Sequence, residues 1–341
     1  YSNILVNHRT ENQPIEELLN EALSGGYNAF RKHLNTNNIS SLHLYSKDLS
    51  SQASGESLLH LSRALQDTNI AELWLSACKI DDLGLKIFAS GLGNTKIKKL
   101  RLASNHISTQ GAIDLSENLK DTEINSLDLS YNEIDNAGLI DFVANLKRTK
   151  LKKLNLTKNK MNDYEIYEFA KCFSGSKVSS LSLGDNNLSD NGAIQLIMGL
   201  KNSPINKLDL SRNNISSNAC YDLANHLKHT NINTIHLWEV PFGPQGASDF
   251  AAGLNGGRFN HINLGLTQFG DDGARAFAEK LMGTQVDKIA LQHNKIGDLG
   301  AKSLASGLNE SMVTYLDLGM NQITENGFSN MITALKESRV E

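Results

Sequence analysis

The sequence predicts an α/β solenoid of eleven strand–helix repeats, with a parallel sheet on its concave face. The motif L-x-L-x-x-N-x-I returns at a constant interval of 27 residues from Leu73 to Leu316, because 316 − 73 = 243 = 9 × 27. Within each interval the spacing of apolar residues changes from two to about four, which indicates a strand followed by a helix. A unit of this size cannot bury its apolar face alone, so neighbouring repeats must stack.

The strands are predicted where the motif opens. In Leu100–Leu102 apolar and polar residues alternate, as in a short strand with one buried face. The first apolar residue of each repeat forms a column that reads Leu42, Leu73, Leu100, Leu127, Leu154, Leu181, Leu208, Ile235, Ile262, Ile289 and Leu316. The first interval is 31 residues long, so repeat one carries a four-residue insertion, which we place in Ser50–Ser57.

The second half of each repeat is predicted to be a helix, because two apolar columns recur four residues apart and neither has a polar member. One column reads Leu61, Phe88, Leu115, Phe142, Phe169, Leu196, Leu223, Phe250, Phe277, Leu304 and Met331. The other reads Leu65, Leu92, Leu119, Leu146, Phe173, Leu200, Leu227, Leu254, Leu281, Leu308 and Leu335. These columns are the predicted core.

Two further columns have structural explanations. The Asn column lies where the chain leaves each strand, and a side-chain amide there can satisfy backbone groups that the turn leaves unpaired. Its members are Asn105, Asn132, Asn159, Asn186, Asn213, Asn294 and Asn321, with Cys78 in repeat two. A Gly column opens the helices, as at Gly111 and Gly192. Close backbone approach or a positive φ explains such glycines without any function.

The two ends of the array differ. Pro14 near a helix start and the apolar residues that follow it predict a helical cap over residues 1–38, which covers the start of a repeat domain at 39–341. Val340 follows Leu335 at the distance that opens a strand elsewhere, so the sequence predicts one of two things: an exposed sheet edge, or a native protein that continues into a twelfth repeat. The chain starts at Tyr1 and not at Met, so the sequence leaves open whether a further segment precedes Tyr1 in the native protein.

The repeat residues over about 39–339 resemble the ribonuclease-inhibitor-like class of leucine-rich repeats, which has a helix in every repeat. The resemblance implies a horseshoe with the sheet inside and the helices outside. Parallel strands lie about 4.8 Å apart whereas packed helices need about 8–10 Å, and that mismatch bends the array.

Composition and motifs exclude several classes of function. A formal net charge of −4 argues against bulk binding of nucleic acid, and no apolar run is long enough to span a membrane. The odd set of Cys78, Cys172 and Cys220 indicates neither a disulfide framework nor a zinc site. Phosphate-binding, metalloprotease and nucleophile-elbow motifs are absent. We therefore expect a cytoplasmic monomer that is not an enzyme and holds no metal or cofactor.

Function is therefore sought on the exposed strand positions −1, +1, +3 and +4, counted from the first apolar residue of each repeat. Trp238 and Trp74, the chain's two tryptophans, both fall there, and aromatic residues are enriched at protein–protein hot spots. The neighbours of Trp238 at the +3 position of the adjacent repeats are small. Trp238 also lies next to a break in the Asn column, where Val240 and Thr267 replace the Asn in repeats eight and nine. Drift of the sequence is the competing explanation of that break.

The predicted partner-binding site surrounds Trp238. It comprises Trp238, His236, Glu239, Arg212, Asp209, His261, Leu266, Gln292 and His293. An apolar centre with a charged rim is typical of interfaces. A secondary partner-binding site is predicted on the first strands, at Trp74, Tyr45, His43 and Arg101. In either place the tryptophan can instead simply cover the sheet.

The favoured function is a non-enzymatic module that grips a protein partner in its concave face. The regular array, the Asn/Lys-rich turns and the few cysteines also resemble leucine-rich effectors of intracellular bacteria such as Legionella. That resemblance implies secretion into the host cytosol and a partner that is a host protein or another effector, masked or inhibited by binding. The alternative is a GTPase-activating protein of the leucine-rich Ran-activator type. Two further functions are disfavoured by the sequence. The ligand-sensing half of a nucleotide-oligomerisation receptor would need an ATPase module, and no phosphate-binding loop is present. A ubiquitin ligase of the bacterial leucine-rich type would need an added Cys-bearing domain, which is not seen.

Overall fold

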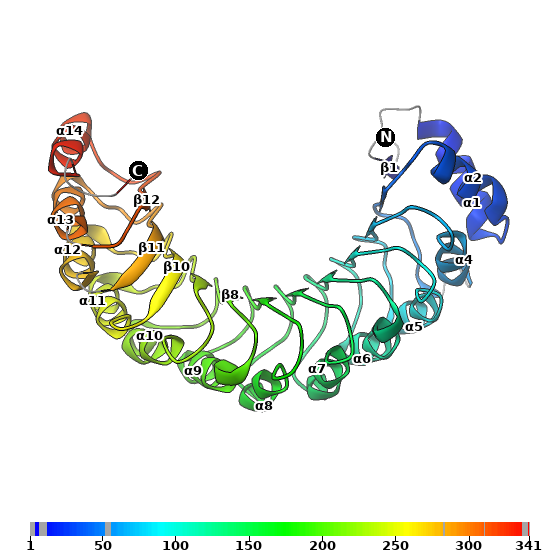
Figure 1. Cartoon of the computed structure of the whole chain (residues 1–341), viewed down its shortest axis with the longest axis horizontal. Helices are drawn as coiled ribbons and strands as arrows, with labels where there is room; N and C mark the ends of the chain where they lie inside the picture. The colour runs from blue at the N-terminus through cyan, green and yellow to red at the C-terminus, as the bar shows by residue number, and fades with distance from the viewer. Residues whose placement is uncertain are drawn as a thin grey trace. The chain divides into compact units, whose positions relative to one another are not determined.

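A computed structural model of the chain describes residues 4–6, 12–51, 56–281, 284–309, 311–335 and 340. The chain divides into two compact units: Tyr1–Met161 with Gly175–Leu181, and Asn162–Ser174 with Ser182–Glu341. Within each unit the strands lie on the inner side and the helices on the outer side (Figure 1). The order of the strands in each unit follows their order in the chain.

The first unit is built on short strands. They are β1 (Ile4–Val6), β2 (Ser41–Leu44), β3 (Glu72–Trp74), β4 (Lys99–Arg101), β5 (Ser126–Asp128), β6 (Lys153–Asn155) and the start of β7 (Ser180–Ser182). From β2 to β6 the pairing is parallel, and the first apolar residues of the repeats face each other in register, as Leu73 faces Leu100. The sequence column is therefore also a row of neighbours in space.

The helices of the first unit cover the outer side of these strands. They are α1 (Asn12–Leu23), α2 (Tyr27–Thr36), α4 (Ser57–Ala64), α5 (Asp82–Ser90), α6 (Thr109–Asn118), the 3-10 helix η1 (Leu119–Asp121) and α7 (Leu139–Leu146). The predicted helix columns are buried here, since Leu61, Phe88 and Phe142 are fully covered. Burial of each such side chain stabilises the fold by about 1.5–3 kcal/mol.

The second unit repeats the arrangement. Its strands are the end of β7, β8 (Lys207–Asp209), β9 (Thr234–His236), β10 (Arg258–Asn263), β11 (Gln285–Ala290) and β12 (Tyr315–Asp317). Its helices are α8 (Ile166–Lys171), α9 (Asp190–Gly199), η2 (Leu200–Asn202), η3 (Ser217–Ala219), α10 (Cys220–Leu227), α11 (Gly243–Gly253), α12 (Gly270–Leu281), α13 (Asp298–Leu308) and α14 (Glu325–Ala334). Strands β8 to β12 are parallel and in register.

The Asn column is a hydrogen-bonding ladder inside the protein. Asn105 Oδ1 accepts from the backbone N–H groups of Cys78 and Ile80, each at 3.0 Å. Its Nδ2 donates to the carbonyl oxygens of Leu75 and Leu102, each at 2.9 Å. The amide thus joins two successive repeats, which confirms the structural explanation of the column. Cys78 occupies the same column with a thiol in place of the amide, and burial raises the pKa of this thiol to about 11.

A second ladder joins the helix starts of successive repeats, and the sequence patterns did not predict it. The carboxylate of Asp190 accepts from Ser216 N at 2.5 Å and from its Oγ at 2.6 Å. Asp298 accepts from Thr324 in the same way, at 2.8 and 2.7 Å. Several members of the Gly column, among them Gly111 and Gly192, leave room for such an acid. A Cβ on Gly327 would lie 2.0 Å from Asp298 Oδ1, so close approach explains that glycine.

The predicted fold class, a solenoid of strand–helix repeats, is confirmed in the described residues, which hold eleven parallel strands alternating with helices. One strand was not predicted: β1 lies within the expected helical cap and pairs antiparallel with β2, Ile4 facing Leu44. The division into a cap at 1–38 and repeats at 39–341 stays a prediction. Of the stretch Ser50–Ser57, in which the insertion is predicted, residues 52–55 lie outside the described residues. So does Glu341, which would extend the strand of a twelfth repeat.

Among the described residues, no helix has both the length and the apolar character needed to span a membrane.

Candidate functional site

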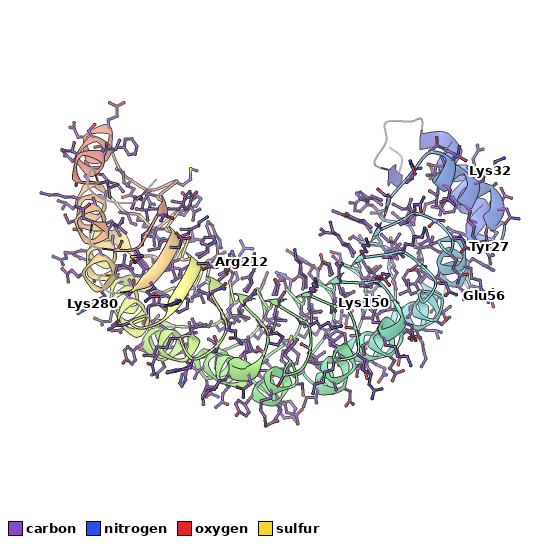
Figure 2. The ribbon with its side chains drawn as sticks, in the orientation of Figure 1. Tyr27, Lys32, Glu56, Lys150, Arg212 and Lys280 are labelled. Atoms are coloured by element: carbon purple, nitrogen blue, oxygen red, sulfur yellow. The ribbon has the colours of Figure 1, made fainter. Side chains whose placement is uncertain are left out.

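The strands of the second unit hold the predicted site because their alternate side chains point away from the helices. In β8 and the residue after it, Leu208 and Leu210 are buried, whereas Lys207 is exposed and Asp209 is partly exposed. Figure 2 shows Arg212 on the inner side of this unit, while Lys280 lies on the helical side. The pleat therefore presents the −1, +1 and +3 side chains on one surface.

The +4 residues do not continue the strands. Every one of them in this unit's predicted site has a left-handed backbone: φ is 56° at Arg212, 57° at Glu239, 56° at Leu266 and 56° at His293. The same conformation recurs at this position in the first unit, for example at Ser104 with φ 58°. Because it recurs in both units, the left-handed turn is part of the fold and does not by itself mark a functional residue.

Trp238 is half-buried and lies flat over a glycine of the next strand's loop. A Cβ built on Gly265 would stand 2.1 Å from Cζ3 and 2.2 Å from Cε3 of the indole. The absent side chain at Gly265 is therefore what makes room for the ring. The far edge of the indole meets His293, with ring centroids 5.7 Å apart and planes at 80°, and Trp238 N donates to Ser211 Oγ at 3.1 Å.

An exposed ion pair and a shallow hollow border the indole. Arg212 Nε donates to Glu239 Oε2 at 2.5 Å, and both side chains are about half exposed, at 54% and 46%. The hollow is lined by Glu239, Pro241, Leu266, Gln268, His293 and Lys295. Pro241 and Leu266 contribute apolar surface to this lining, and Glu239 and Lys295 contribute charge. It lies beside the indole because His293 belongs to both.

Two histidines lie side by side on the neighbouring strands. The rings of His236 and His261 meet edge to face with centroids 5.5 Å apart, and His236 Nε2 is buried without a hydrogen-bond partner. Burial lowers the pKa of His236, which Asp209 opposes and Lys207 and His261 reinforce. Burial also lowers the pKa of His261, together with Lys207 and Lys288.

These shifts predict a loss of stability in mild acid. A histidine whose folded pKa lies below 6.5 binds fewer protons than in the unfolded chain, so the free energy of unfolding falls as the pH drops below about 6.5. We expect urea unfolding at pH 5.5 to show lower stability than at pH 7.5. In the His236→Gln/His261→Gln variant that loss should shrink, whereas His229→Gln, at an exposed position, should leave it unchanged. An equal loss in all three proteins would contradict the assignment.

Two predicted site residues serve the fold more than the surface. Asp209 Oδ1 accepts from Ser211 N at 3.0 Å and from Ser211 Oγ at 2.6 Å. Gln292 Nε2 donates to Asp317 Oδ2 at 2.5 Å. Asp209 is thus turned toward its own loop, and the amide of Gln292 toward the next strand. Both remain on the predicted surface, at its margin.

The two-repeat break next to Trp238 is a coherent alternative loop. In repeats eight and nine the position usually held by Ile is Phe, and Phe242 and Phe269 are fully buried. Each is followed by a glycine with φ 61°, Gly243 and Gly270. Gly243 N donates to Thr267 O at 3.0 Å. The larger Phe and the left-handed Gly redirect the loop together, so the missing ladder Asn has a structural explanation.

The secondary site residues form a compact stack in the first unit. His43 stacks on Trp74 with centroids 4.3 Å apart, and the Arg101 guanidinium lies 4.2 Å from the centre of the same indole. Tyr45 meets the indole edge to face at 6.2 Å. Burial lowers the pKa of His43, and Arg101 adds to that effect while Glu72 opposes it. All four predicted residues are therefore in contact.

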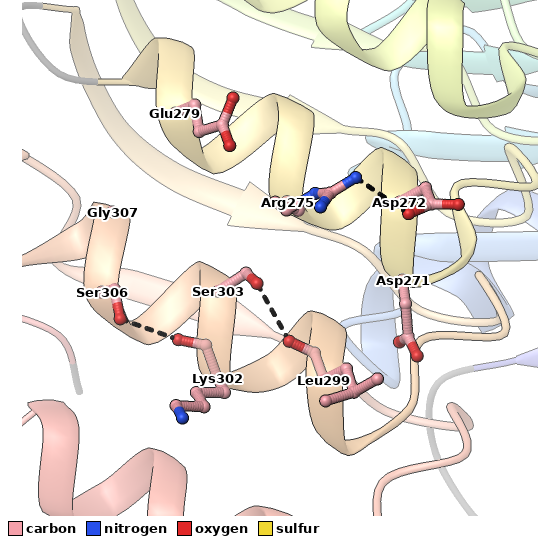
Figure 3. A pocket seen from close by; sticks show the side chains of 9 residues that line it. All are labelled: Asp271, Asp272, Arg275, Glu279, Leu299, Lys302, Ser303, Ser306 and Gly307. Carbon is pink, nitrogen blue, oxygen red and sulfur yellow. Dashed lines mark hydrogen bonds and ion pairs between the residues drawn. The ribbon is translucent and has the colours of Figure 1, made fainter.

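A further hollow lies on the helical side of the second unit, between α12 and α13 (Figure 3). Arg275 pairs with Asp272 at 3.1 Å there, and Leu299 is 73% exposed. Asp271 accepts from the backbone N–H groups of Gly297 and Gly300, so this acid belongs to the helix-start ladder. The chemistry of the hollow is mixed, with charges of both signs.

The structure thus gathers most of the predicted site around two contacts, Trp238 with His293 and His236 with His261. Sequence reasoning missed Lys207 and Lys288, which flank the histidines, and Lys295 in the hollow. The −1 column was available as a signal for the first two, since it alternates with the buried column. Within the described ranges, no group of three or more His, Cys, Asp or Glu is placed to hold a metal ion.

Comparison with known proteins agrees with the repeat. The family described as Leucine Rich repeat matches residues 93–116, 122–143, 176–196, 201–224, 259–278, 288–305 and 310–330. No curated protein matches the chain. The matched segments follow the 27-residue register of the sequence.

Two solved structures are similar at low identity. One is Leiomodin-1 Actin-Binding Site 2, at 18% identity over 42% of this chain and 78% of that chain, with a TM-score of 0.32. The other is an internalin from Listeria monocytogenes, at 16% identity over 96% of both chains, with a TM-score of 0.42. The assignment does not depend on them. The family matches, the register and the paired strands agree that the matched segments of this chain are leucine-rich repeats.

Proposed function

We propose that this chain is a non-enzymatic protein-binding module that holds its partner against the inner face of the strands. The observation that carries the proposal is the seat of Trp238. Its indole is half-buried beside Gly265, and it contacts His293, which lines the hollow. A rigid aromatic ring in that position offers a large contact area at little cost in side-chain entropy.

The surroundings of Trp238 favour a role in binding over the alternative that its side chain only covers the sheet. The Arg212–Glu239 pair is exposed and lies next to the apolar surface at Leu266. An apolar centre inside a charged rim excludes water from the contact while the rim sets orientation. The stack of Trp74 with His43 and Arg101 is the secondary contact, with the same composition.

The finer proposal concerns class and setting. The helix-containing repeats are of the ribonuclease-inhibitor-like subtype. The protein is a secreted effector of an intracellular bacterium that masks or inhibits a host protein or another effector in the host cytosol. Both statements follow from the sequence resemblance. The alternative is activation of a Ran-type GTPase, which follows from the repeat class alone. If the purified chain accelerated GTP hydrolysis by such a GTPase, activation would replace masking as the proposed role.

Differential capture tests the proposed function. The wild-type chain, Trp238→Ala and Trp74→Ala serve as baits in one host-cell lysate, and mass spectrometry compares what each retains. We expect at least one protein to be retained by the wild type and lost with Trp238→Ala, because the anchor is missing. Purified partner and bait must then form a complex of defined stoichiometry. Equal retention by all three folded baits would contradict the proposal.

The exposed ion pair gives a kinetic prediction. Arg212→Glu is expected to slow association with the captured partner by up to about tenfold at low salt, because rim charges act mainly on the encounter rate. The difference should shrink at high salt, where charges are screened. Stability should change by less than about 1 kcal/mol, since exposed ion pairs contribute little. Stopped-flow association at two ionic strengths measures this, with Lys280→Glu on the helical side as control. A salt-independent defect would contradict a rim role.

A further inference from the structure

A row of basic groups crosses the second unit beside the Trp238 site. Lys207, Thr234, His261 and Lys288 are direct neighbours on consecutive parallel strands, as their register shows. His236 contacts His261 from the +1 position of β9. We call Lys207, His236, His261 and Lys288 the basic row. Strand spacing makes the row about 14 Å long from end to end.

The cations of the basic row are available. Lys207 and Lys288 are exposed, and within the described ranges no ion pair joins either of them to an acid. The acids on the same surface are already engaged: Asp209 with Ser211, Asp317 with Gln292, and Glu239 with Arg212. Hydrogen bonds to Ser211 and Gln292 leave the charges of Asp209 and Asp317 in place, so the positive charge is confined to the −1 positions, where Lys207 and Lys288 carry it.

The two histidines add a conditional charge. A proton on the buried His236 Nε2 has no acceptor in the free protein. Lys207 and Lys288 hold positive charge next to the ring pair, and Asp209 is the acid that faces His236 from β8. A carboxylate brought by a partner would offset the repulsion between these cations. It would also favour the charged form of both histidines.

From this arrangement we infer that the partner presents an acidic segment to the basic row, next to an apolar side chain that reaches Trp238. The inference rests on the proposed function and specifies its partner by chemistry. The −1 and +3 positions of one strand are four residues apart, which is about 13 Å. An extended partner segment therefore places its acids roughly four residues from its apolar anchor. Nucleic acid fits less well, because Asp209, Asp317 and Glu239 flank the row.

Linkage gives the sign of the pH dependence. Both histidines have pKa values below the ordinary range in the free protein, and a bound carboxylate raises them, so complex formation takes up protons. Affinity therefore increases as the pH falls through the pKa values of the bound state, and the gain is complete below those of the free state. The acids of the partner stay ionised at pH 6, since their pKa values are about 4.

Peptide selection on the full chain tests the inference. A random peptide-display library is panned at pH 6 against the wild type, with subtraction against Lys207→Glu/Lys288→Glu, and the enriched peptides are titrated by fluorescence polarisation. We expect acidic peptides that carry an aromatic or aliphatic residue. Their dissociation constant should rise about tenfold or more in the charge-reversed variant. Lys153→Glu, also at an exposed −1 position but in the first unit, should change it less than twofold.

The remaining arms separate this inference from the proposed function. Binding should weaken several-fold between pH 6 and pH 7.5 for the wild type and become nearly pH-independent in His236→Gln/His261→Gln. Enrichment of neutral or basic peptides, or no enrichment over the subtracted variant, overturns the acidic partner. If neutral peptides bound and their binding depended on Trp238, the acidic partner would be rejected while the proposed protein-binding function remained supported. Binding of a thymidine oligonucleotide to the basic row more tightly than any enriched peptide would assign the row to nucleic acid.

Discussion

Replacement of Trp238 by alanine is expected to weaken binding of the captured partner by about 2–4 kcal/mol, which is 30-fold or more. The reason is the position of the indole, which is half-buried beside Gly265 and contacts His293 in the lining of the hollow. The effect should be mainly on the dissociation rate, as for a central anchor. Isothermal titration of one partner against Trp238→Ala and Trp74→Ala decides between the two predicted sites. An unchanged dissociation constant for Trp238→Ala would remove repeat eight from the interface.

Gly265→Ala tests the same contact without removing the tryptophan. Gly265 does not have a positive φ, so alanine fits its backbone, but the new methyl group would occupy the space of the indole. We expect the ring to move and the affinity to fall nearly as far as in Trp238→Ala. In a Trp74→Phe background, Trp238 is the remaining tryptophan of the chain, and its emission should shift. Gly319→Ala is the matched control, because its Cβ would meet only Asp317 and Gln292.

The repeat framework could be predicted from the sequence because each column reports one physical constraint. The first apolar column is buried between sheet and helices, and its period fixed the register that the paired strands show, as Leu73 with Leu100. The Asn column was interpretable for the same reason, since an amide has both a donor and an acceptor to offer. The position of Trp238 on the surface followed from counting along the strand.

Other features depend on contacts between repeats that no single repeat encodes. The left-handed +4 residues include Tyr131, Lys158 and Leu266, and these residue types give no signal for that conformation. The bonds from Asp190 to Ser216 join residues 26 apart, so they exist only once the repeats are stacked. The strand β1 is three residues long and pairs with β2 far along the chain. Its pairing is set by the folded sheet and not by local pattern.

The candidate site was predictable in location but not in detail. The sequence placed Trp238, His236 and His293 on one surface, but the direction in which the indole lies depends on the space left at Gly265. The break at Val240 was interpreted as a possible mark of function, with drift as the alternative. The buried Phe242 and the left-handed Gly243 instead show that the loop has its own framework. The break therefore no longer supports the site, and the argument for it rests on Trp238 and its neighbours.

The largest expected loss of stability in the framework follows Asn105→Ala. The substitution leaves Cys78 N and Ile80 N without their acceptor and Leu75 O without its donor, whereas Leu102 O keeps a bond from Asn132 Nδ2 at 3.0 Å. An unsatisfied buried polar group costs about 1–3 kcal/mol, and some of these groups will find water. We therefore expect the free energy of unfolding to fall by about 3 kcal/mol. Chemical denaturation monitored by circular dichroism measures it.

A threonine at the same position should cost less than alanine. Thr267 occupies this column in repeat nine, and its Oγ1 donates to Leu264 O at 2.7 Å, which corresponds to Leu102 O in the repeat of Asn105. Asn105→Thr can thus keep one of the bonds, although the two backbone donors still lose their acceptor. Asn69→Ala is the surface control, because Asn69 is exposed and its Oδ1 accepts from the exposed Lys96 Nζ at 2.9 Å. The ladder is structural, so the folded fraction of Asn105→Ala should bind the partner normally. A stable Asn105→Ala protein that cannot bind would instead make the Asn column part of the interface.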